Sequence, residues 1–218
     1  MKAKFGLPSV NSSFMRLSEL GYQQKEIIDV GAHKGDRSVV INKLYPQATI
    51  FRFEPIETYY NRLQILSEKF GNNSKAYNYL LSSKSYEVLK FYVNESVSLV
   101  LEEHYISSNV VVQDKTTSAL DEVICLTSTN ALLKIDVQDF ELEVLKGAKN
   151  IIKNIECIQM EISLIDINKN APLIHEVLRV MNKEYGFVLY DITEMIRRPI
   201  DKALWQLDVI FLKKIQKC

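Results

Sequence analysis

Proline and glycine are scarce in this chain of 218 residues, which has five prolines and seven glycines. No stretch rich in proline, glycine and serine separates two halves, and neither an internal repeat nor a low-complexity tract is present. Linkers between domains are built from such stretches. We therefore expect residues 1–218 to form a single domain, with residues 1–25 as a helical lead-in.

A net charge is also missing, because 27 lysines and arginines balance 27 aspartates and glutamates. Nucleic acids and anionic membrane surfaces attract proteins with a basic surface. The balance predicts no nucleic-acid partner and no membrane partner.

Cysteines are few and long apolar runs are absent. Cys125, Cys157 and Cys218 lie far apart and form no C-x-x-C pair, which is typical of free thiols in a reducing compartment. No window approaches the roughly 18 to 20 apolar residues of a membrane span, and the first residues contain no apolar stretch of a secretion signal. These absences predict a soluble, cytoplasmic protein.

What the chain does contain is an alternation of strand and helix patterns. The expected helices are residues 14–21, 36–44, 57–70, 119–124, 140–150 and 171–184. The expected strands are residues 26–30, 48–54, 76–82, 131–136, 155–162, 186–192 and 204–212. This order predicts an α/β fold with a doubly wound, mainly parallel sheet. The last two strands have no helix between them, so they can pair antiparallel.

An additional pair of strands is expected as a small β-hairpin insertion at about residues 87–114. Residues 87–93 and 109–113 are rich in β-branched and aromatic side chains, which favour strands. The polar connection at 94–108 carries His104, a candidate for contacting a substrate.

The first candidate site is D-V-G-A-H-K-G-D (29–36), which follows the first strand of the sheet. Ligands of doubly wound sheets bind beyond the carboxyl ends of the strands. Gly31 and Gly35 would let the backbone approach such a ligand, and the next helix, with Asp36 as a possible N-cap, offers unpaired amides. A simple tight turn is the alternative interpretation.

The second candidate site is F-R-F-E-P, which places Glu54 at the end of the second strand. A carboxylate about 20 residues beyond a glycine turn can accept hydrogen bonds from both hydroxyls of a ribose. The alternative is a solvated glutamate.

These two motifs, together with L-L-K-I-D-V-Q-D-F-E-L-E-V-L-K-G-A (132–148), resemble the FkbM-type S-adenosylmethionine-dependent methyltransferases of class I. The closing L-W-Q-L-D-V-I-F-L resembles the last strand of that family. The resemblance covers roughly residues 14–212. It implies a seven-stranded, Rossmann-like sheet with an antiparallel last strand and S-adenosylmethionine as cofactor.

The resemblance also implies the cofactor contacts. Gly31, Ala32 and Gly35 would line the methionine and ribose part of the cofactor. Glu54 would hold the ribose hydroxyls, and Leu81 and Ser82 would border the adenine. The full predicted set is Asp29, Gly31, Ala32, His33, Gly35, Glu54, Pro55, Leu81, Ser82 and Asp136.

Two positions deserve comparison with the usual sequence pattern of this family. His33 stands where the family has Asn or His, so a hydrogen-bonding side chain is retained. Asp139 stands where the family usually has Gly. If this position needs a positive φ, Asp tolerates it at some energetic cost. The loop shape, and with it the substrate fit, depends on this residue.

The predicted catalytic residues are Asp136 and Glu161, which follow or end two adjacent strands. Methyl transfer to a hydroxyl requires a positioned nucleophile and a group that takes up its proton. We expect Asp136 to contact the cofactor's ammonium or to act as a base, and Glu161 to act as a base or to orient the substrate. Helix capping or solvation is the alternative for both.

A metal ion is possible but is not predicted. Some related methyltransferases of vicinal diols hold Mg²⁺ with carboxylates at these strand ends, and Asp136 and Glu161 could supply two oxygen ligands. Asp166 and Asn168 lie nearby in sequence, yet no third ligand is evident. No metal-ligand set is therefore assigned.

The predicted function is O-methylation of a hydroxyl on a sugar, a glycan precursor or a secondary metabolite, so the partner is a small molecule or a glycan. An N-methyltransferase is disfavoured, because I-D-V-Q-D-F lacks the N/D-P-P-Y/F pattern. A nicotinamide-dependent oxidoreductase is disfavoured by the G-x-x-x-G spacing and by the antiparallel last strand. A non-catalytic, Rossmann-like nucleotide-binding protein stays open as an alternative.

Overall fold

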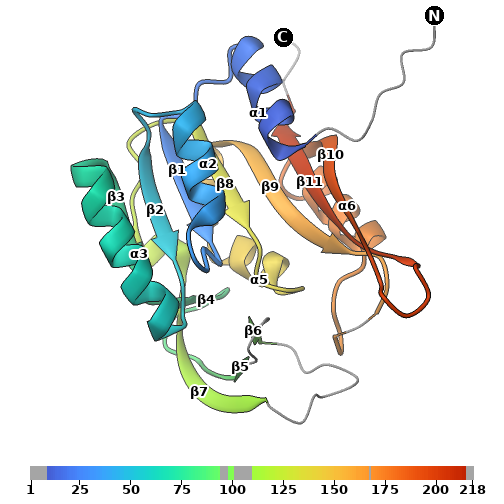
Figure 1. Ribbon diagram of the computed structural model, residues 1–218. Helices are drawn as coiled ribbons and strands as arrows, with labels where there is room; N and C mark the ends of the chain where they lie inside the picture. Colours follow the sequence, from blue (N-terminus) through green and yellow to red (C-terminus); the bar gives the residue numbers. More distant parts are fainter. Residues whose placement is uncertain (1–8, 94–97, 101–109, 167, 215–218) are drawn as a thin grey trace, which may run out of the picture.

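The computed structural model describes residues 9–93, 98–100, 110–166 and 168–214, and its framework is a seven-stranded sheet (Figure 1). Its strands are β1 (Glu26–Val30), β2 (Thr49–Phe53), β3 (Ser74–Tyr77), β8 (Ala131–Ile135), β9 (Ile155–Ser163), β10 (Phe187–Arg197) and β11 (Leu204–Lys213). Their spatial order is β10-β11-β9-β8-β1-β2-β3. All neighbours are parallel except that β11 runs antiparallel to both β9 and β10. The predicted doubly wound sheet with an antiparallel last strand is confirmed.

Helices cover both faces of this sheet (Figure 1). They are α1 (Val10–Glu19), α2 (Asp36–Leu44), α3 (Glu57–Phe70), α4 (Leu120–Val123), α5 (Glu141–Lys146) and α6 (Ile174–Lys183), with 3₁₀ turns η1 (Gly71–Asn73) and η2 (Ile151–Asn154). One buried cluster joins α1 and α2 to alternate side chains of the strands, such as Ile27 and Leu132. The other joins α4, α5 and α6 to the opposite face, which includes Ile28 and Leu133. Successive strand residues therefore supply two separate cores.

Two helix starts differ from the prediction. α1 begins at Val10 rather than at residue 14, because the Ser9 side chain accepts a hydrogen bond from the Ser12 amide at 3.2 Å and so caps the helix. α2 begins at the expected residue, but Asp36 is its first helical residue and not its N-cap. The cap is Gly35 in the left-handed region, with φ 82°.

A second sheet contains β4 (Leu80–Leu81), β5 (Val88–Val93), β6 (Ser98–Leu99) and β7 (Val111–Ser118), in the order β4-β7-β5-β6. β5 and β7 pair antiparallel, so the predicted hairpin is present. The insertion is larger than predicted, because β7 continues to Ser118 and pairs parallel with β4. Figure 1 shows this small sheet beyond the carboxyl ends of β1 and β2. His104 lies outside the described residues.

The single strand predicted at 76–82 is wrong. The chain leaves the main sheet after Tyr77 and joins the small sheet at Leu80. Asn78 marks the crossing, since its side-chain amide donates to the Glu54 carbonyl oxygen at 2.8 Å. An apolar pattern alone cannot show which sheet a residue joins.

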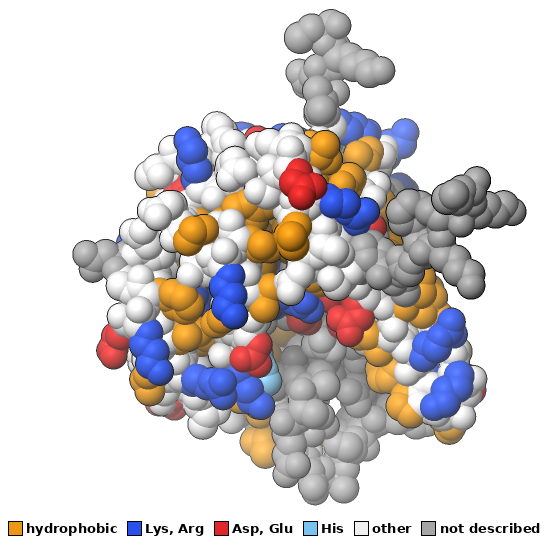
Figure 2. Space-filling view, turned by 45° about the horizontal axis from the view of Figure 1, so that its top comes forward, with side chains coloured by type: hydrophobic (Ala, Val, Ile, Leu, Met, Phe, Trp, Pro, Cys, Tyr) orange, Lys and Arg blue, Asp and Glu red, His pale blue; other side chains and the backbone are white. Residues whose placement is uncertain are grey.

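The surface carries both signs of charge. On the face shown in Figure 2, acidic and basic side chains are interspersed, and hydrophobic side chains lie in small groups between them. Among the residues that the structure describes, no helix combines the length and the apolar character needed to cross a membrane.

Candidate functional site

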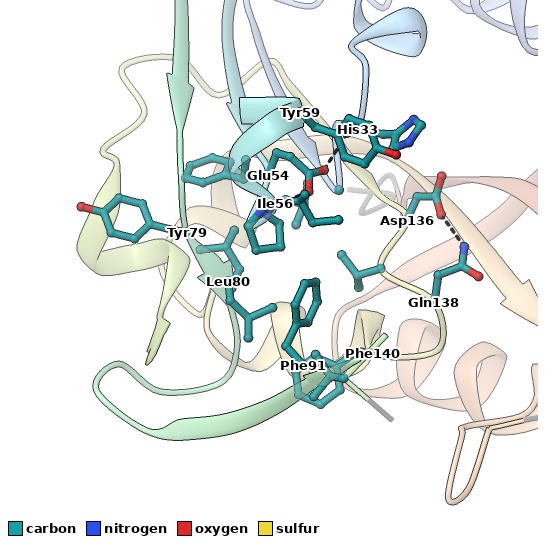
Figure 3. Close-up of a pocket in the computed structure, with 17 residues that line it drawn as sticks. His33, Glu54, Ile56, Tyr59, Tyr79, Leu80, Phe91, Asp136, Gln138 and Phe140 are labelled. Carbon is teal, nitrogen blue, oxygen red and sulfur yellow. Dashed lines mark hydrogen bonds between the residues drawn. The ribbon is translucent and has the colours of Figure 1, made fainter. Parts of the chain in front are cut away.

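A cavity of about 250 Å³ lies between the carboxyl edge of the main sheet and the small sheet (Figure 3). The small sheet and the segment that leads into it contribute Tyr79, Leu80, Leu81 and Phe91. The main sheet and its loops contribute mainly apolar groups as well, among them Phe53 and Phe140, and a few polar ones. A mostly apolar hollow with few polar side chains is the usual form of a small-molecule site.

Glu54 is the buried carboxylate of this cavity. Its Oε2 accepts a hydrogen bond from the His33 amide at 2.8 Å, and its Oε1 accepts one from the Ile56 amide at 3.0 Å (Figure 3). Burial raises the pKa of Glu54, and these two amides partly oppose the shift. The loops after β1 and β2 therefore fix the orientation of one carboxylate, and each oxygen keeps a lone pair for a further donor.

The glycine turn after β1 is bound tightly to its neighbours. The amides of Gly31 and Ala32 both donate to the Phe53 carbonyl oxygen at 3.0 Å. Gly31 has φ 70°, and a Cβ placed on it would lie 1.9 Å from the carbonyl oxygen of Asp136. The contact between the β1 and β8 loops therefore requires a glycine at this position, whether or not a ligand also approaches it.

Gly35 packs closely against helix α3. It has φ 82°, and its missing Cβ would lie 2.6 Å from a methyl group of Leu66 and 2.9 Å from one of Leu63, both on α3. The second glycine therefore permits the packing of the turn against α3, and it is not among the described residues that line a cavity.

A second and more open hollow lies on the other side of the turn and has a volume of about 320 Å³. It meets the first cavity at Gly31, His33 and Asp136, which line both. Unlike the first cavity, whose charged side chains are only acidic, it is lined by cations as well, and its charged side chains are Lys34, Asp36, Arg37, Lys134 and Asp136. The two hollows together offer an apolar end and a charged end.

Arg37 and His33 have defined surroundings at this junction. The Arg37 guanidinium donates to the Asp208 carboxylate at 3.0 Å. The His33 ring lies 4.0 Å from the Tyr59 ring, measured between centroids. Burial, with the nearby Lys34 ammonium, lowers the pKa of His33, so its imidazole is neutral at pH 7.

Asp136 and Glu161, the two predicted catalytic carboxylates, are joined by an amide. Gln138 Nε2 donates to Asp136 Oδ1 at 3.1 Å and to Glu161 Oε1 at 2.9 Å, and Gln206 Nε2 donates to the same Glu161 oxygen at 2.7 Å. Asp136 lines both hollows, whereas Glu161 is not among the described residues that line either one. The two groups are close, but only one of them lines a cavity.

Glu161 lies in a strongly acidic environment. Burial raises its pKa to about 9, and the carboxylates of Asp136, Glu141, Asp208 and Asp139 add to the shift. Its carboxyl group is therefore protonated at neutral pH and can donate a hydrogen bond. That state does not suit a general base.

The loop after β8 is held in an unusual conformation. Gln138 and Asp139 have φ 57° and 70°, so the positive φ considered for Asp139 is present. The buried Asp139 carboxylate accepts a hydrogen bond from Asn168 Nδ2 at 2.8 Å, and Glu141 Oε1 accepts the Val137 amide at 2.9 Å. Consecutive left-handed residues other than glycine are strained and persist where surrounding contacts hold them.

The predicted cofactor residues divide into two groups. Those that line a cavity are Gly31, Ala32, His33, Glu54, Pro55, Leu81 and Asp136. The others are Asp29, Gly35 and Ser82. Asp29 is fully buried and forms an ion pair with Lys134 at 3.1 Å, and the Ser82 amide is bonded to the Ser118 carbonyl oxygen of β7.

Sequence reasoning missed Lys134, Gln138 and Phe91. The sequence could have indicated Lys134, because a lysine inside the apolar run A-L-L-K-I must find charged or polar partners when it is buried. No sequence pattern indicates Phe91 or Gln138, since their positions depend on how the insertion and the loop fold. As for a metal, no set of three His, Cys, Asp or Glu side chains within the described ranges is placed to hold one.

Methyltransferases are among the solved structures with a similar fold. 1,6-Didemethyltoxoflavin-N1-methyltransferase from Burkholderia thailandensis, solved with 1,6-didemethyltoxoflavin and S-adenosylhomocysteine, aligns with a TM-score of 0.54 at 10% identity, over 93% of this chain and 76% of that one. A suggested RNA methyltransferase from Pyrococcus horikoshii aligns with a TM-score of 0.51 at 15% identity, over 94% and 83%. These identities show a shared fold alone, which is the Rossmann-like fold of class I methyltransferases.

The family follows from the sequence as well. The model of the methyltransferase FkbM domain matches residues 29–189, so the chain belongs to the FkbM methyltransferase family. The FkbM methyltransferase from Methylobacillus flagellatus aligns with a TM-score of 0.53 at 14% identity over 86% of this chain, which spans only 43% of that protein. No sequence among the curated proteins matches the chain.

Proposed function

We propose that the protein is an S-adenosylmethionine-dependent O-methyltransferase that acts on a hydroxyl of a sugar, a glycan precursor or a secondary metabolite. The observation that carries this proposal is the pair of hollows that meet at Gly31, His33 and Asp136, with the buried Glu54 in the apolar one and cations in the other. Family membership supports the same reaction class.

The residues present fit the chemistry of S-adenosylmethionine from end to end. Leu80, Leu81 and Phe91 provide an apolar slot for an adenine, and the oriented carboxylate of Glu54 provides acceptors for two ribose hydroxyls. A zwitterionic tail suits the charged hollow, where Asp136 matches an ammonium and Lys34 and Arg37 match a carboxylate. The other contacts expected of Asp29, Gly35 and Ser82 would be indirect.

The cofactor, when bound, supplies an electrophilic methyl group on a sulfonium. The protein's own task is to exclude water, to hold the acceptor oxygen in line and to remove its proton. Asp136 is our candidate for the proton acceptor or the ammonium contact, because its carboxylate is partly exposed at the junction of the hollows. Glu161, which does not line either hollow among the described residues, would orient the acceptor indirectly, through its hydrogen bond with Gln138.

Calorimetric titration with S-adenosylmethionine, S-adenosylhomocysteine and NADH tests the cofactor. We expect micromolar binding of the first two and none of the third. Glu54→Ala should weaken binding by tenfold or more, since hydrogen bonds to a charged group contribute about 1.5 to 3 kcal/mol. Glu57→Ala, an exposed residue in the first turn of α3, is the matched control. Equal affinities of the two variants would refute the ribose assignment.

Transfer of a radiolabelled methyl group to a panel of acceptors tests the reaction. The panel should contain hydroxyl compounds, such as sugars, sugar nucleotides and phenols, together with amines and RNA. Labelled hydroxyl compounds support O-methylation. Labelling of amines or RNA alone would refute it, and cofactor binding without transfer to any acceptor would favour the non-catalytic alternative.

Two further expectations rest on the sequence. The prediction that no nucleic acid is a partner rests on the balanced charge of the sequence, and the RNA in the acceptor panel tests it. A cytoplasmic location depends on the unpaired cysteines. Both stay predictions.

A further inference from the structure

Four buried polar side chains form a row across the middle of the main sheet. Strand pairing places Arg52 of β2 beside Asp29 of β1, Asp29 beside Lys134 of β8, and Lys134 beside Gln159 of β9. All four are at most 4% exposed. A buried charge is costly unless it is paired or serves a function.

The two cations of this row have different surroundings. The Arg52 guanidinium donates to the hydroxyls of Ser38, Ser67 and Ser74, which belong to α2, α3 and β3. None of these contacts reaches the two hollows. Arg52 therefore connects the elements beneath the site, and its role is structural.

Lys134, in contrast, reaches the carboxyl edge of the sheet. Its Nζ donates to the Gly31 carbonyl oxygen at 2.7 Å and to that of Val30 at 3.3 Å. The same atom lies 3.1 Å from Asp29 Oδ1 and 3.6 Å from Asp136 Oδ2. Burial lowers the pKa of Lys134, but Asp29 and Asp136 outweigh burial and raise it, so the ammonium stays charged.

We propose that Lys134 is the positioning residue of the cofactor site, tying the glycine turn to Asp136 and so setting the opening between the two hollows. This inference rests on the proposed function, because that opening is where a ligand would pass from one hollow to the other. Asp29 then acts through Lys134, whose charge it balances from the buried side. This explains why Asp29 precedes the glycine turn without lining a cavity.

Asp136 is held from both sides in this arrangement. Lys134 approaches Oδ2, and Gln138 donates to Oδ1. Without the ammonium, the Gly31 carbonyl oxygen and Asp136 Oδ2 would face each other as two acceptors with no donor between them. Their mutual repulsion would separate the β1 and β8 loops at the junction of the hollows.

The test compares Lys134→Met with Arg52→Met, since both remove one buried cation from the same row. The readouts are the affinity for S-adenosylhomocysteine by calorimetry, the melting temperature, and hydrogen exchange of the Gly31 and Asp136 amides in the ligand-free protein. We expect both variants to melt at lower temperature. Lys134→Met alone should lose tenfold or more in affinity and exchange these two amides faster.

The double variant Asp29→Asn with Lys134→Met covers the case in which Lys134→Met does not fold. It also removes the Asp29 carboxylate that Lys134→Met leaves without its lysine partner, so it should recover part of the melting temperature without recovering affinity. Recovery of both, or equal affinity losses in Lys134→Met and Arg52→Met, would show that Lys134 only stabilises the fold. Wild-type protein that bound no S-adenosylhomocysteine would refute the proposed function and this inference together. Wild-type binding with unchanged affinity in both Lys134 variants would refute this inference alone.

Discussion

The backbone of Gly31 touches the backbone of Asp136, and a Cβ on Gly31 would come within 1.9 Å of the Asp136 carbonyl oxygen. The same two residues line both hollows. The contact brings the ends of β1 and β8 together where the proposed reaction takes place. The site therefore depends on a close approach of two loops as much as on any side chain.

Gly31→Ala should destabilise the protein and distort the site. Alanine at this position would be strained at φ 70° and would also collide with the β8 loop, so we expect a loss of about 2 kcal/mol or more in the free energy of unfolding. Gly186→Ala is the matched control, because its φ is 74° and no atom lies within 4 Å of the added Cβ. Urea denaturation measures both. Equal losses would mean that backbone strain alone matters at Gly31.

Stability should fall as the pH rises from about 5 to 9, in part because of Glu161. Its pKa is 4.5 when unfolded and about 9 when folded, so between these values the folded protein holds a proton that the unfolded chain has released. Glu161→Gln stays neutral, and we expect it to exceed the wild type by about 2 kcal/mol or more at pH 9, with a much smaller difference at pH 5. Denaturation at several pH values tests this. An unchanged slope in the variant would contradict it.

Phe91→Ala should weaken nucleoside binding. Phe91 is 3% exposed and reaches the cavity from β5 of the small sheet, so its removal takes away apolar contact area where we place the adenine. We expect the affinity for S-adenosylhomocysteine to drop about tenfold, measured by calorimetry. Tyr92→Ala changes the next residue of the same strand, which is not among the described lining residues. A similar loss in both variants would indicate general damage to the small sheet.

Cys125 and Cys157 should differ in reactivity. Cys125 is exposed, whereas Cys157 is buried in β9 and burial raises the pKa of its thiol. Iodoacetamide should label Cys125 in the native protein and Cys157 only after unfolding, and peptide mass spectrometry can follow each thiol separately. Rapid native labelling of Cys157 would indicate that the centre of the sheet opens readily.

Much of the fold was predictable from the sequence because each main strand is a short apolar run next to a helical pattern. The residues of β1 and β8 show this clearly. The pattern failed at residues 76–82, where two short strands of different sheets follow each other within one apolar stretch. Periodicity reports which face is buried, but it does not report the partner strand.

The candidate site was only partly predictable. Glu54 and Asp136 could be found because an acid at the end of a strand points toward the ligand edge of such a sheet. Gly35, which we predict to contact the cofactor, packs against α3 in the structure, since a glycine can serve packing as well as binding. The apolar run around Lys134 indicates a buried lysine, but its partners depend on strand register. Gln138 reaches the site through loop geometry, which no local pattern encodes.

The hydrogen bonds to Glu54 have a consequence for selectivity. Because the backbone already aims this carboxylate, a ligand with two vicinal hydroxyls would meet matching acceptors at little entropic cost. A 2′-deoxy analogue would leave the remaining lone pair of one buried oxygen without a donor, so it would be rejected more strongly than its small change in shape suggests. The Glu54 carboxylate and the two backbone amides that orient it would thus be enough to discriminate ribonucleosides from deoxyribonucleosides.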